Sequence, residues 1–352
     1  MTVPSQSHSR CRLTVYWMTT RRRAVIALGL NALAIGTRWS PAGAAPPRGK
    51  VLRLGLLYGL REKFEPESNS VDRALAEGLR AYGYQIGRNV TLEFRSAAGT
   101  FERLPELAAE LAQLKVDILI ALGESATRAA HKATNTIPIV MVGIPDPVAT
   151  GLAASLSRPG GNFTGLALNA TDIAAKRVQL LKEAVPKLSR VAVLWNSSFK
   201  SMELQFQKVE IAAPTLGISV LSLRVQSGAN FDEAFAAILK ARPDGMIVLF
   251  GPMRGSDLPR IVEFVNANHL PTIFELDRGV RGGGLMEFGP SFADLAGQVG
   301  FYVDKIANGA SPADLPIQEP TRFEFVVNLS AARKMGLTLP ATVLNRADRL
   351  VE

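Results

Sequence analysis

Short apolar runs alternate with amphipathic stretches along most of the chain, and this alternation restricts the possible folds more than any other feature. The expected strands of the first half are four apolar runs, at 51–58, 89–95, 116–122 and 137–143. The stretches between them have the apolar spacing of helices, at 71–82, 101–114 and 125–133. Strands that alternate with helices form parallel sheets with right-handed crossovers.

The same pattern is repeated in the second half of the chain. Helices are expected at 172–184, 202–216, 231–241 and 258–268. Strands are expected at 190–195, 219–225, 245–250 and 271–275. The strands are apolar throughout, as strands covered by helices on both faces should be. The sequence therefore predicts an α/β protein with two successive doubly wound, Rossmann-like lobes.

The first 44 residues have the composition of an export signal. They contain six arginines and no acidic residue, and Arg21-Arg22-Arg23 precedes a short apolar run. Small residues end the segment at Ala44, where signal peptidase could cleave. A membrane anchor is the alternative, but the run is too short and interrupted to span about 30 Å of hydrocarbon. Met18 is a possible true start, and both general secretion and twin-arginine export stay open.

The basic excess of the chain belongs mostly to this segment. The formal net charge is +9, from 40 basic and 31 acidic side chains. Removal of the six N-terminal arginines leaves 34 basic side chains, a net charge of +3. This balance gives no reason to expect nucleic acid as a partner. We expect a soluble exported chain that does not insert into the membrane.

Cysteine and histidine usage excludes several kinds of chemistry. The only cysteine is Cys11, which precedes the predicted cleavage point, so the exported chain would have no disulfide, thiol nucleophile or lipid-modified cysteine. Its only histidines would be His131 and His269, too few for a multi-histidine metal site. The first expected strand is not followed by GxGxxG, and no P-loop is present. We expect no metal, no cofactor, no catalytic residue and no enzyme activity.

Ligands of parallel sheets lie beyond the carboxyl ends of the strands. Small, hydroxyl, amide and carboxylate groups occupy these positions here, at Gly59, Gly123, Glu124, Ser125, Asp146, Asn196, Gly251 and Glu275. Such groups suit hydrogen bonds to a small polar molecule better than covalent chemistry. Phe250, Phe274 and Phe288 near strand ends are either an aromatic wall of the site or core residues.

Two of these residues have alternative interpretations. Ser125 lies where a helix N-cap is expected, and the same helix start could also bind a ligand carboxylate. Asp146 lies between two prolines, where it could accept hydrogen bonds from a ligand ammonium or from the backbone of its own turn. Gly160-Gly161-Asn162 has the composition of a turn with positive φ.

Four long segments carry a family resemblance: "GYQIGRNVTLEFRSAAGTFERLPELAAELAQLKVDILIALG", "IPIVMVGIPDPVATGLAASLSRPGGNFTGLAL", "YVDKIANGASPADLPIQEPTRFEFVVNLSAARKMGLTLP" and "LNRADRLVE". They resemble the ABC-transporter substrate-binding family that includes tryptophan-binding proteins. The resemblance covers about residues 50–352, in order and without large gaps.

The resemblance implies a type I periplasmic-binding-protein architecture, in which three crossover hinge strands join two lobes. The first lobe would comprise 50–166 and 287–320, and the second 167–286 and 321–352. The crossovers would lie near 163–169, 284–289 and 322–328. Asn169, Asn196 and Glu275 would face the cleft from the second lobe. Relatives usually have Thr-Pro or Thr-Ser where this chain has Glu124-Ser125, which adds a carboxylate near the cleft.

The implied function is that of the periplasmic solute-binding component of an ABC importer. It would capture a small polar or aromatic solute, an amino acid or similar compound, between the lobes. Its partners would be this ligand and an ABC permease with its ATPase, and the protein would act as a monomer. The alternative is a ligand-sensing periplasmic protein of the same fold that docks on a membrane sensor.

Overall fold

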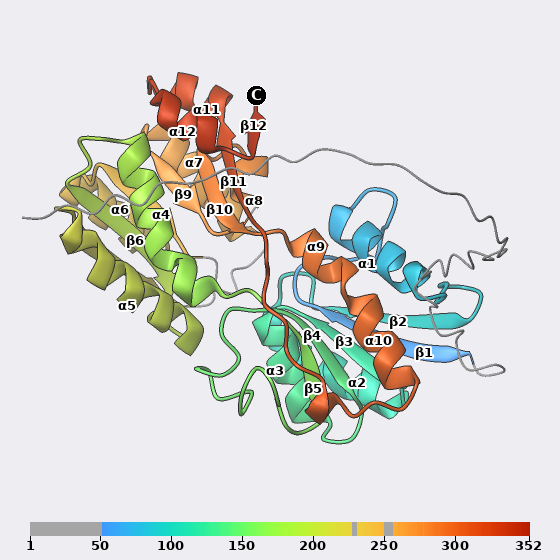
Figure 1. The fold of residues 1–352 in the computed structure, drawn as a ribbon. Coiled ribbons are helices and arrows are strands. Elements are labelled where there is room, and N and C mark those ends of the chain that lie inside the picture. The colour runs from blue at the N-terminus through green and yellow to red at the C-terminus, as the bar shows by residue number, and fades with distance from the viewer. Residues whose placement is uncertain (1–50, 227–230, 250–255, 277) are drawn as a thin grey trace, which may run out of the picture. The chain divides into compact units, whose positions relative to one another are not determined.

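The computed structural model describes residues 51–226, 231–249, 256–276 and 278–352 (Figure 1). The predicted signal segment with Cys11 lies outside these ranges, as do Phe250 and Gly251. Among the described residues, every helix is too short or too polar to reach across a lipid bilayer.

The first half of the chain forms a parallel five-stranded sheet in the order β2-β1-β3-β4-β5. Its strands are β1 (Leu52–Tyr58), β2 (Val90–Ser96), β3 (Ile118–Leu122), β4 (Ile139–Ile144) and β5 (Phe163–Ala167). Every residue of β3, β4 and β5 is buried, whereas the edge strand β2 is largely half-buried. Cover on both faces explains why the inner strands are apolar throughout.

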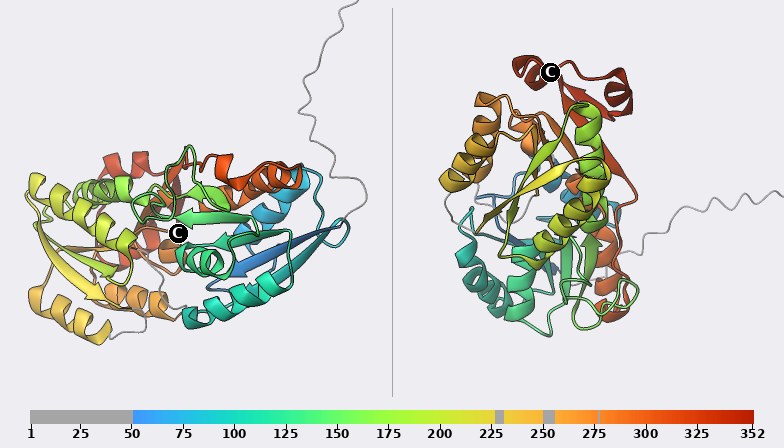
Figure 2. Two further views of the ribbon diagram at one scale, coloured as in Figure 1. Left: turned by 90° about the horizontal axis from the view of Figure 1, so that it is seen from below. Right: turned by 90° about the vertical axis from the view of Figure 1, so that its left-hand side faces the viewer.

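Helices from both ends of the sequence cover this sheet. They are α1 (Ser70–Ala81), α2 (Leu104–Gln113), α3 (Glu124–Ala133), α9 (Phe292–Gly297) and α10 (Val299–Ala307). A short 3-10 turn, η1 (Phe101–Arg103), precedes α2 where the sequence predicts a single helix. The late helices α9 and α10 pack beside α1 on one face, and α2 and α3 lie on the other (Figure 2). We call this sheet and its helices the first lobe.

The rest of the chain forms a seven-stranded sheet in the order β12-β11-β10-β9-β8-β6-β7, in which only the β10–β11 pair is antiparallel. Its strands are β6 (Arg190–Asn196), β7 (Ser219–Val225), β8 (Gly245–Val248), β9 (Thr272–Phe274), β10 (Met286–Pro290), β11 (Phe323–Asn328) and β12 (Arg349–Val351).

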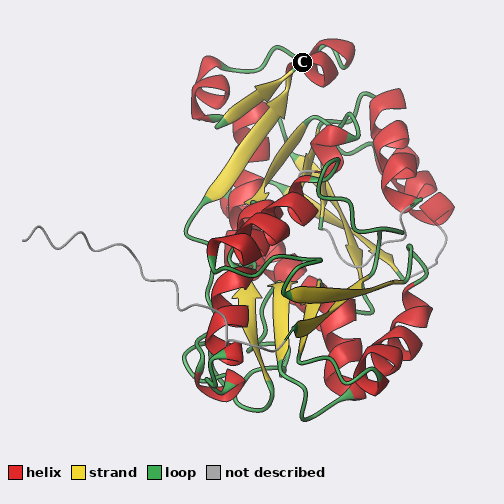
Figure 3. Ribbon diagram, turned by 90° about the vertical axis from the view of Figure 1, so that its right-hand side faces the viewer, coloured by secondary structure: helices red, strands yellow, loops and turns green. Residues whose placement is uncertain are grey.

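Helices also pack on the seven-stranded sheet and bury its middle strands, whereas the edge strands β7 and β12 are partly exposed (Figure 3). They are α4 (Ala170–Ala184), α5 (Lys200–Thr215), α6 (Phe231–Ala241), α7 (Asp257–Ala267), α8 (Arg278–Arg281), α11 (Leu329–Lys334) and α12 (Ala341–Arg346). We call this sheet and its helices the second lobe.

The chain passes between the lobes three times. It leaves the first sheet after β5, returns to it after β10, and leaves it again after η2 (Pro312–Asp314) to form β11. The third crossing runs beside the first, because Gln318 N–H donates to Gly165 O at 2.9 Å and Ala167 N–H donates to Gln318 O at 2.8 Å. The predicted fold, two doubly wound lobes joined by three crossovers, is confirmed.

Candidate functional site

The topology of the first lobe places a crevice at the ends of β1 and β3. The strand order reverses between these two strands, because β2 follows β1 on one side and β3 lies on the other. Connections at such a point leave the sheet in opposite directions and open a space beyond the strand ends. Tyr58 and Gly59 end β1, and Gly123 and Glu124 follow β3.

A mainly apolar cavity occupies this crevice. The volume that the centres of water molecules can occupy inside it is about 100 Å³. Its aromatic lining residues are Tyr58, Phe101 and Phe292, and its aliphatic lining residues include Leu60, Leu122, Leu168, Met202 and Leu276. Most of the lining belongs to the first lobe, while Met202, Leu276, Arg278 and Arg281 belong to the second. A concave apolar space with a few polar groups is typical of a site for a small organic molecule.

The polar end of the cavity is the start of α3. Gly123 has a φ of 89°, a left-handed value that lets β3 turn directly into the helix. The helix therefore begins at Glu124, and the prediction of Ser125 as its N-cap is wrong. Ser125 is the second helical residue, and its Oγ is shielded from solvent without a hydrogen-bond partner among the described residues. Ser125 lines the cavity, and its covered hydroxyl lies in the first turn of a helix, whose N–H groups have no partner within the helix.

Glu124 is the only carboxylate among the described residues that line the cavity. Its Oε1 accepts hydrogen bonds from Arg128 Nε at 3.0 Å and Nη2 at 2.8 Å, one turn further along α3. Its Oε2 accepts a hydrogen bond from Ser201 Oγ of α5, in the second lobe, at 2.5 Å. The additional carboxylate expected from the sequence is therefore beside the cavity, and it joins the two lobes.

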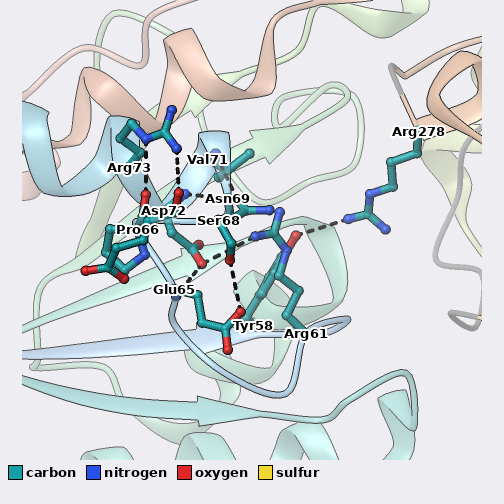
Figure 4. A network of polar contacts seen from close by, with 11 residues as sticks. Tyr58, Arg61, Glu65, Pro66, Ser68, Asn69, Val71, Asp72, Arg73 and Arg278 are labelled. Atoms are coloured by element: carbon teal, nitrogen blue, oxygen red, sulfur yellow. Dashed lines mark hydrogen bonds and ion pairs between the residues drawn. The ribbon is translucent and has the colours of Figure 1, made fainter.

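Tyr58 lies between two arginines at the rim of the cavity (Figure 4). The Arg61 guanidinium is 5.6 Å from the centre of the Tyr58 ring, in cation–π range, and Arg61 Nη1 is 3.3 Å from Asp72 Oδ2. From the second lobe, Arg278 Nη2 donates a hydrogen bond to Tyr58 Oη at 3.0 Å. These contacts fix the Tyr58 ring and place positive charge at the rim.

The sequence analysis missed most of these side chains. Tyr58 could have been found, because it is the last residue of the first predicted strand. Arg61 lies in the charged segment that follows the same strand. Phe101, Phe292 and Arg278 carry no local signal. Phe101 lies in η1 after an edge strand, Phe292 follows a crossing of the chain, and Arg278 comes from the other lobe.

Asp146 and Asn169 lie together, but outside this cavity. They line an outer depression with Asp172 and Glu319. Asp146 Oδ1 accepts a hydrogen bond from Ala149 N–H at 2.8 Å, which agrees with the turn interpretation of this residue. Burial, followed by the charges of Asp172 and Asp146, raises the pKa of Glu319.

Asn196 and Glu275 are buried in the second lobe and do not line the cavity. Asn196 Oδ1 accepts a hydrogen bond from Ser198 N–H at 3.0 Å. Glu275 Oε1 is 3.7 Å from Nη2 of Arg177, which is fully buried. Burial lowers the pKa of Arg177, and the Glu275 carboxylate partly opposes this effect.

The expected aromatic wall is also placed differently. Phe274 belongs to the core of the second lobe, and Phe288 packs against Phe323 with ring centres 6.1 Å apart. The structure thus brings together Gly59, Gly123, Glu124 and Ser125 from the set predicted to bind ligand.

The fold and this cavity define a two-lobed solute-binding protein. The family model described as ABC transporter substrate binding protein matches residues 66–351. The chain therefore belongs to this family, as its sequence segments indicated, and its fold is that of type I periplasmic binding proteins. It is a solute-binding protein and not an enzyme.

Three relatives illustrate the similarity. The tyrosine-binding protein of Clostridioides difficile (strain R20291) is 24% identical over 274 residues, which are 77% of this chain and 78% of that protein. A conserved domain protein of Vibrio cholerae has a TM-score of 0.78 at 25% identity, over 86% of this chain and all of that one. An ABC domain from Streptococcus pneumonia, solved with L-Trp, has a TM-score of 0.75 at 23% identity, over 85% of this chain and 99% of that one.

Proposed function

We propose that the cavity binds a small carboxylate with an aromatic or branched apolar body, most simply an amino acid such as tryptophan or tyrosine. The observation that carries this proposal is the Ser125 hydroxyl, which has no hydrogen-bond partner among the described residues and belongs to a residue of the cavity wall, beside three aromatic rings. A buried hydroxyl without a hydrogen bond is costly, and a ligand carboxylate would satisfy it. The relatives named for tyrosine and solved with L-Trp support the same class.

The arrangement suggests how such a ligand would lie. Its carboxylate would accept hydrogen bonds from Ser125 Oγ and from the first N–H groups of α3, which favour an anion. Its apolar body would pack among Tyr58, Phe101 and Phe292. Arg61 and Arg278 at the rim would add to the attraction of a negatively charged ligand.

We further propose that the protein serves an ABC importer and acts in the periplasm. Residues 1–44 would be removed on export, and the closed form would be presented to a permease with its ATPase, from a monomer. The lobes would comprise 50–166 with 287–320 and 167–286 with 321–352. The two sheets and the family membership support this division and this role.

Thermal unfolding of protein refolded from denaturant, which strips carried ligand, tests the binding proposal. Aromatic and branched amino acids, polyamines, sugars and aromatic acids would be compared. A ligand at about 100 times its dissociation constant adds about 2.7 kcal/mol, a shift of a few degrees in a chain of this size. We expect this shift with aromatic or branched carboxylates.

Ser125→Ala is the matched variant for this test. It should weaken binding of the carboxylate about tenfold, because it removes one hydrogen bond to a charged group. The unfolding temperature of the free variant should not fall, because the hydroxyl has no partner to lose. A shift with sugars or polyamines alone, or equal affinity of Ser125→Ala and the natural chain, would contradict the proposal.

A further inference from the structure

Two hydrogen bonds join the lobes at the cavity. Ser201 Oγ of the second lobe donates to Glu124 Oε2 of the first at 2.5 Å, and Arg278 Nη2 of the second lobe donates to Tyr58 Oη of the first at 3.0 Å. Glu124, Tyr58 and Arg278 line the cavity themselves. Whatever separates the lobes must therefore break contacts made by residues of the cavity wall.

The start of α5 favours a nearby negative charge, and Glu203 of its own first turn is paired with Lys200 at 2.9 Å. The helix has 16 residues, and its N-cap residue, Phe199, provides no side-chain hydrogen bond. Ser201 lies in the first turn and is fully buried. The N-terminal end of a helix carries a partial positive charge and unsatisfied N–H groups. The Glu124 carboxylate thus complements the start of α5 from the opposite lobe.

Glu124 has a second partner that does not depend on the position of the lobes. Arg128 lies in the same helix and binds Oε1 through two nitrogens. The Arg128 side chain is 34% exposed, so it remains solvated in part. When the lobes separate, the carboxylate keeps this ion pair and exchanges Ser201 for water. The contact can therefore form and break without leaving an unpaired buried charge, which would cost several kcal/mol.

We infer that Glu124 and Ser201 form a latch that stabilises the closed arrangement of the lobes, with Tyr58 and Arg278 as its second point. Glu124 is then a positioning residue, whose effect on binding comes through closure. A ligand that fills the cavity would pack against the Tyr58 ring, while the Glu124–Ser201 hydrogen bond would act on it through closure alone. The inference rests on the proposed function for its link to ligand binding, whereas the latch itself can be tested without ligand.

The first test measures the distance between the lobes in ligand-free protein. Spin labels would be attached at Glu106→Cys on α2 and Ile211→Cys on α5, both exposed, in a chain with Cys11→Ser. Ser201→Ala should shift the distribution towards longer distances, and Glu124→Gln should do the same. Ser198→Ala is the matched control. Ser198 is exposed and precedes α5 in the sequence, and its hydroxyl makes no hydrogen bond to the other lobe among the described residues. An unchanged distribution in Ser201→Ala would overturn the latch.

The second test separates closure from ligand contact. Each variant would be titrated with tryptophan and with indole-3-propionate, which lacks only the ammonium group. If the latch acts through closure, Ser201→Ala and Glu124→Gln should lower the affinity for both compounds by the same factor, about tenfold, mainly through faster dissociation. The double variant should be little weaker than either single one. Tyr58→Phe, which keeps the ring, should also weaken both equally.

The outcomes that would contradict the latch can be told apart from those that would contradict the proposed function. If Glu124→Gln lowers the affinity for tryptophan alone and Ser201→Ala has no effect, Glu124 contacts the ligand directly. The latch is then wrong, while the proposed function stands. If the natural chain binds neither compound, the proposed ligand class is wrong, and the label distances still decide the latch. If Ser201→Ala behaves as Ser198→Ala in both tests, the contact contributes nothing to closure.

Discussion

The strand ends of the two lobes differ although both sheets are doubly wound. In the first lobe, Gly59, Gly123 and Ser125 face an apolar cavity, and the serine hydroxyl has no partner among the described residues. In the second lobe, Asn196 and Glu275 occupy comparable strand ends but are buried and bonded within the lobe. The strand ends of the first lobe therefore line an open cavity, whereas these two strand-end residues of the second lobe are covered.

Arg177 is the main reason for this difference. It extends from α4 into the second lobe, where its Nε donates to Phe288 O of β10 at 2.9 Å and its Nη1 donates to Gln205 Oε1 of α5 at 3.2 Å. Its third nitrogen faces Glu275 at the end of β9. One buried side chain thus ties two helices to the strands next to the hinge. The second lobe is braced there, and it offers the cavity only a few side chains.

Arg177→Met tests this bracing and should have the largest effect. The change leaves the buried Glu275 carboxylate without this cation and removes hydrogen bonds to β10 and α5. Breaking a buried ion pair by removing one partner typically costs about 3–5 kcal/mol. We expect the free energy of unfolding in urea to fall by about this amount.

Lys176→Met is the control on the same helix. Lys176 Nζ donates to Gln179 Oε1 at the surface, so its loss should change stability by less than about 0.5 kcal/mol. Equal stability of Arg177→Met and Lys176→Met would show that the buried cation does not brace the second lobe.

Gly143→Ala tests whether the position of the Phe292 ring in the wall of the first-lobe cavity matters for stability and ligand binding. Gly143 lies at the bulge that ends β4 and has a φ of 81°. A Cβ at this position would lie 2.2 Å from Cε2 of Phe292, which lines the cavity. Strain and displacement of the ring should lower the free energy of unfolding by about 1–3 kcal/mol. Ligand affinity should fall as well, because the aromatic wall moves.

Gly160→Ala separates the two causes. Gly160 has a φ of 77° in the turn before β5, and an added Cβ would meet no atom within 4 Å. It should cost about 1 kcal/mol through the backbone alone and leave ligand affinity unchanged. If both variants bind ligand equally well, Phe292 is not part of the recognition surface.

The fold could be predicted from the sequence because its information is local and periodic. Apolar runs and helical spacing identified most strands and helices up to residue 275 to within a few residues, and the helices beyond it were not predicted. The strand-end rule indicated Gly59 and Gly123 at the cavity. Glu275 does not line this cavity, and the strand-end rule gives no information on a buried arginine that reaches a strand end from another helix. The N-cap was predicted two residues too late, at Ser125 instead of Gly123, since the positive φ of Gly123 starts α3 earlier.

The remainder of the site depends on contacts between distant segments. Phe292 reaches the cavity from the second crossing of the chain, and Ser201 reaches Glu124 across 77 positions of sequence. Glu124 was recognised as an unusual carboxylate. Its partner Arg128 lies one turn further along the same helix, whereas Ser201 becomes evident only when two helix starts face each other. Asp146 was ambiguous between ligand and turn, and only its hydrogen bond to Ala149 distinguishes these roles.

The outer depression differs from the cavity in its concentration of carboxylates, and the expected effect on stability is the smallest. Here Asp146 and Asp172 surround Glu319 with negative charge, and burial together with these two carboxylates raises the pKa of Glu319 in the folded protein. Between its unfolded and folded pKa values, the unfolded chain therefore binds fewer protons than the folded one. Stability due to this group is complete below the unfolded pKa and declines as the pH rises through the folded pKa.

Glu319→Gln should consequently stabilise the protein at neutral pH and have no effect at low pH. Because Glu319 is exposed, solvent screening limits the gain to a few tenths of a kcal/mol. Urea unfolding from about pH 4 to pH 7 would measure it. In an Asp172→Asn background the gain should shrink, because one source of repulsion is absent. If the gain in stability does not depend on pH or on Asp172, charge repulsion is not its cause. The accumulated negative charge would then not be what distinguishes the depression from the cavity.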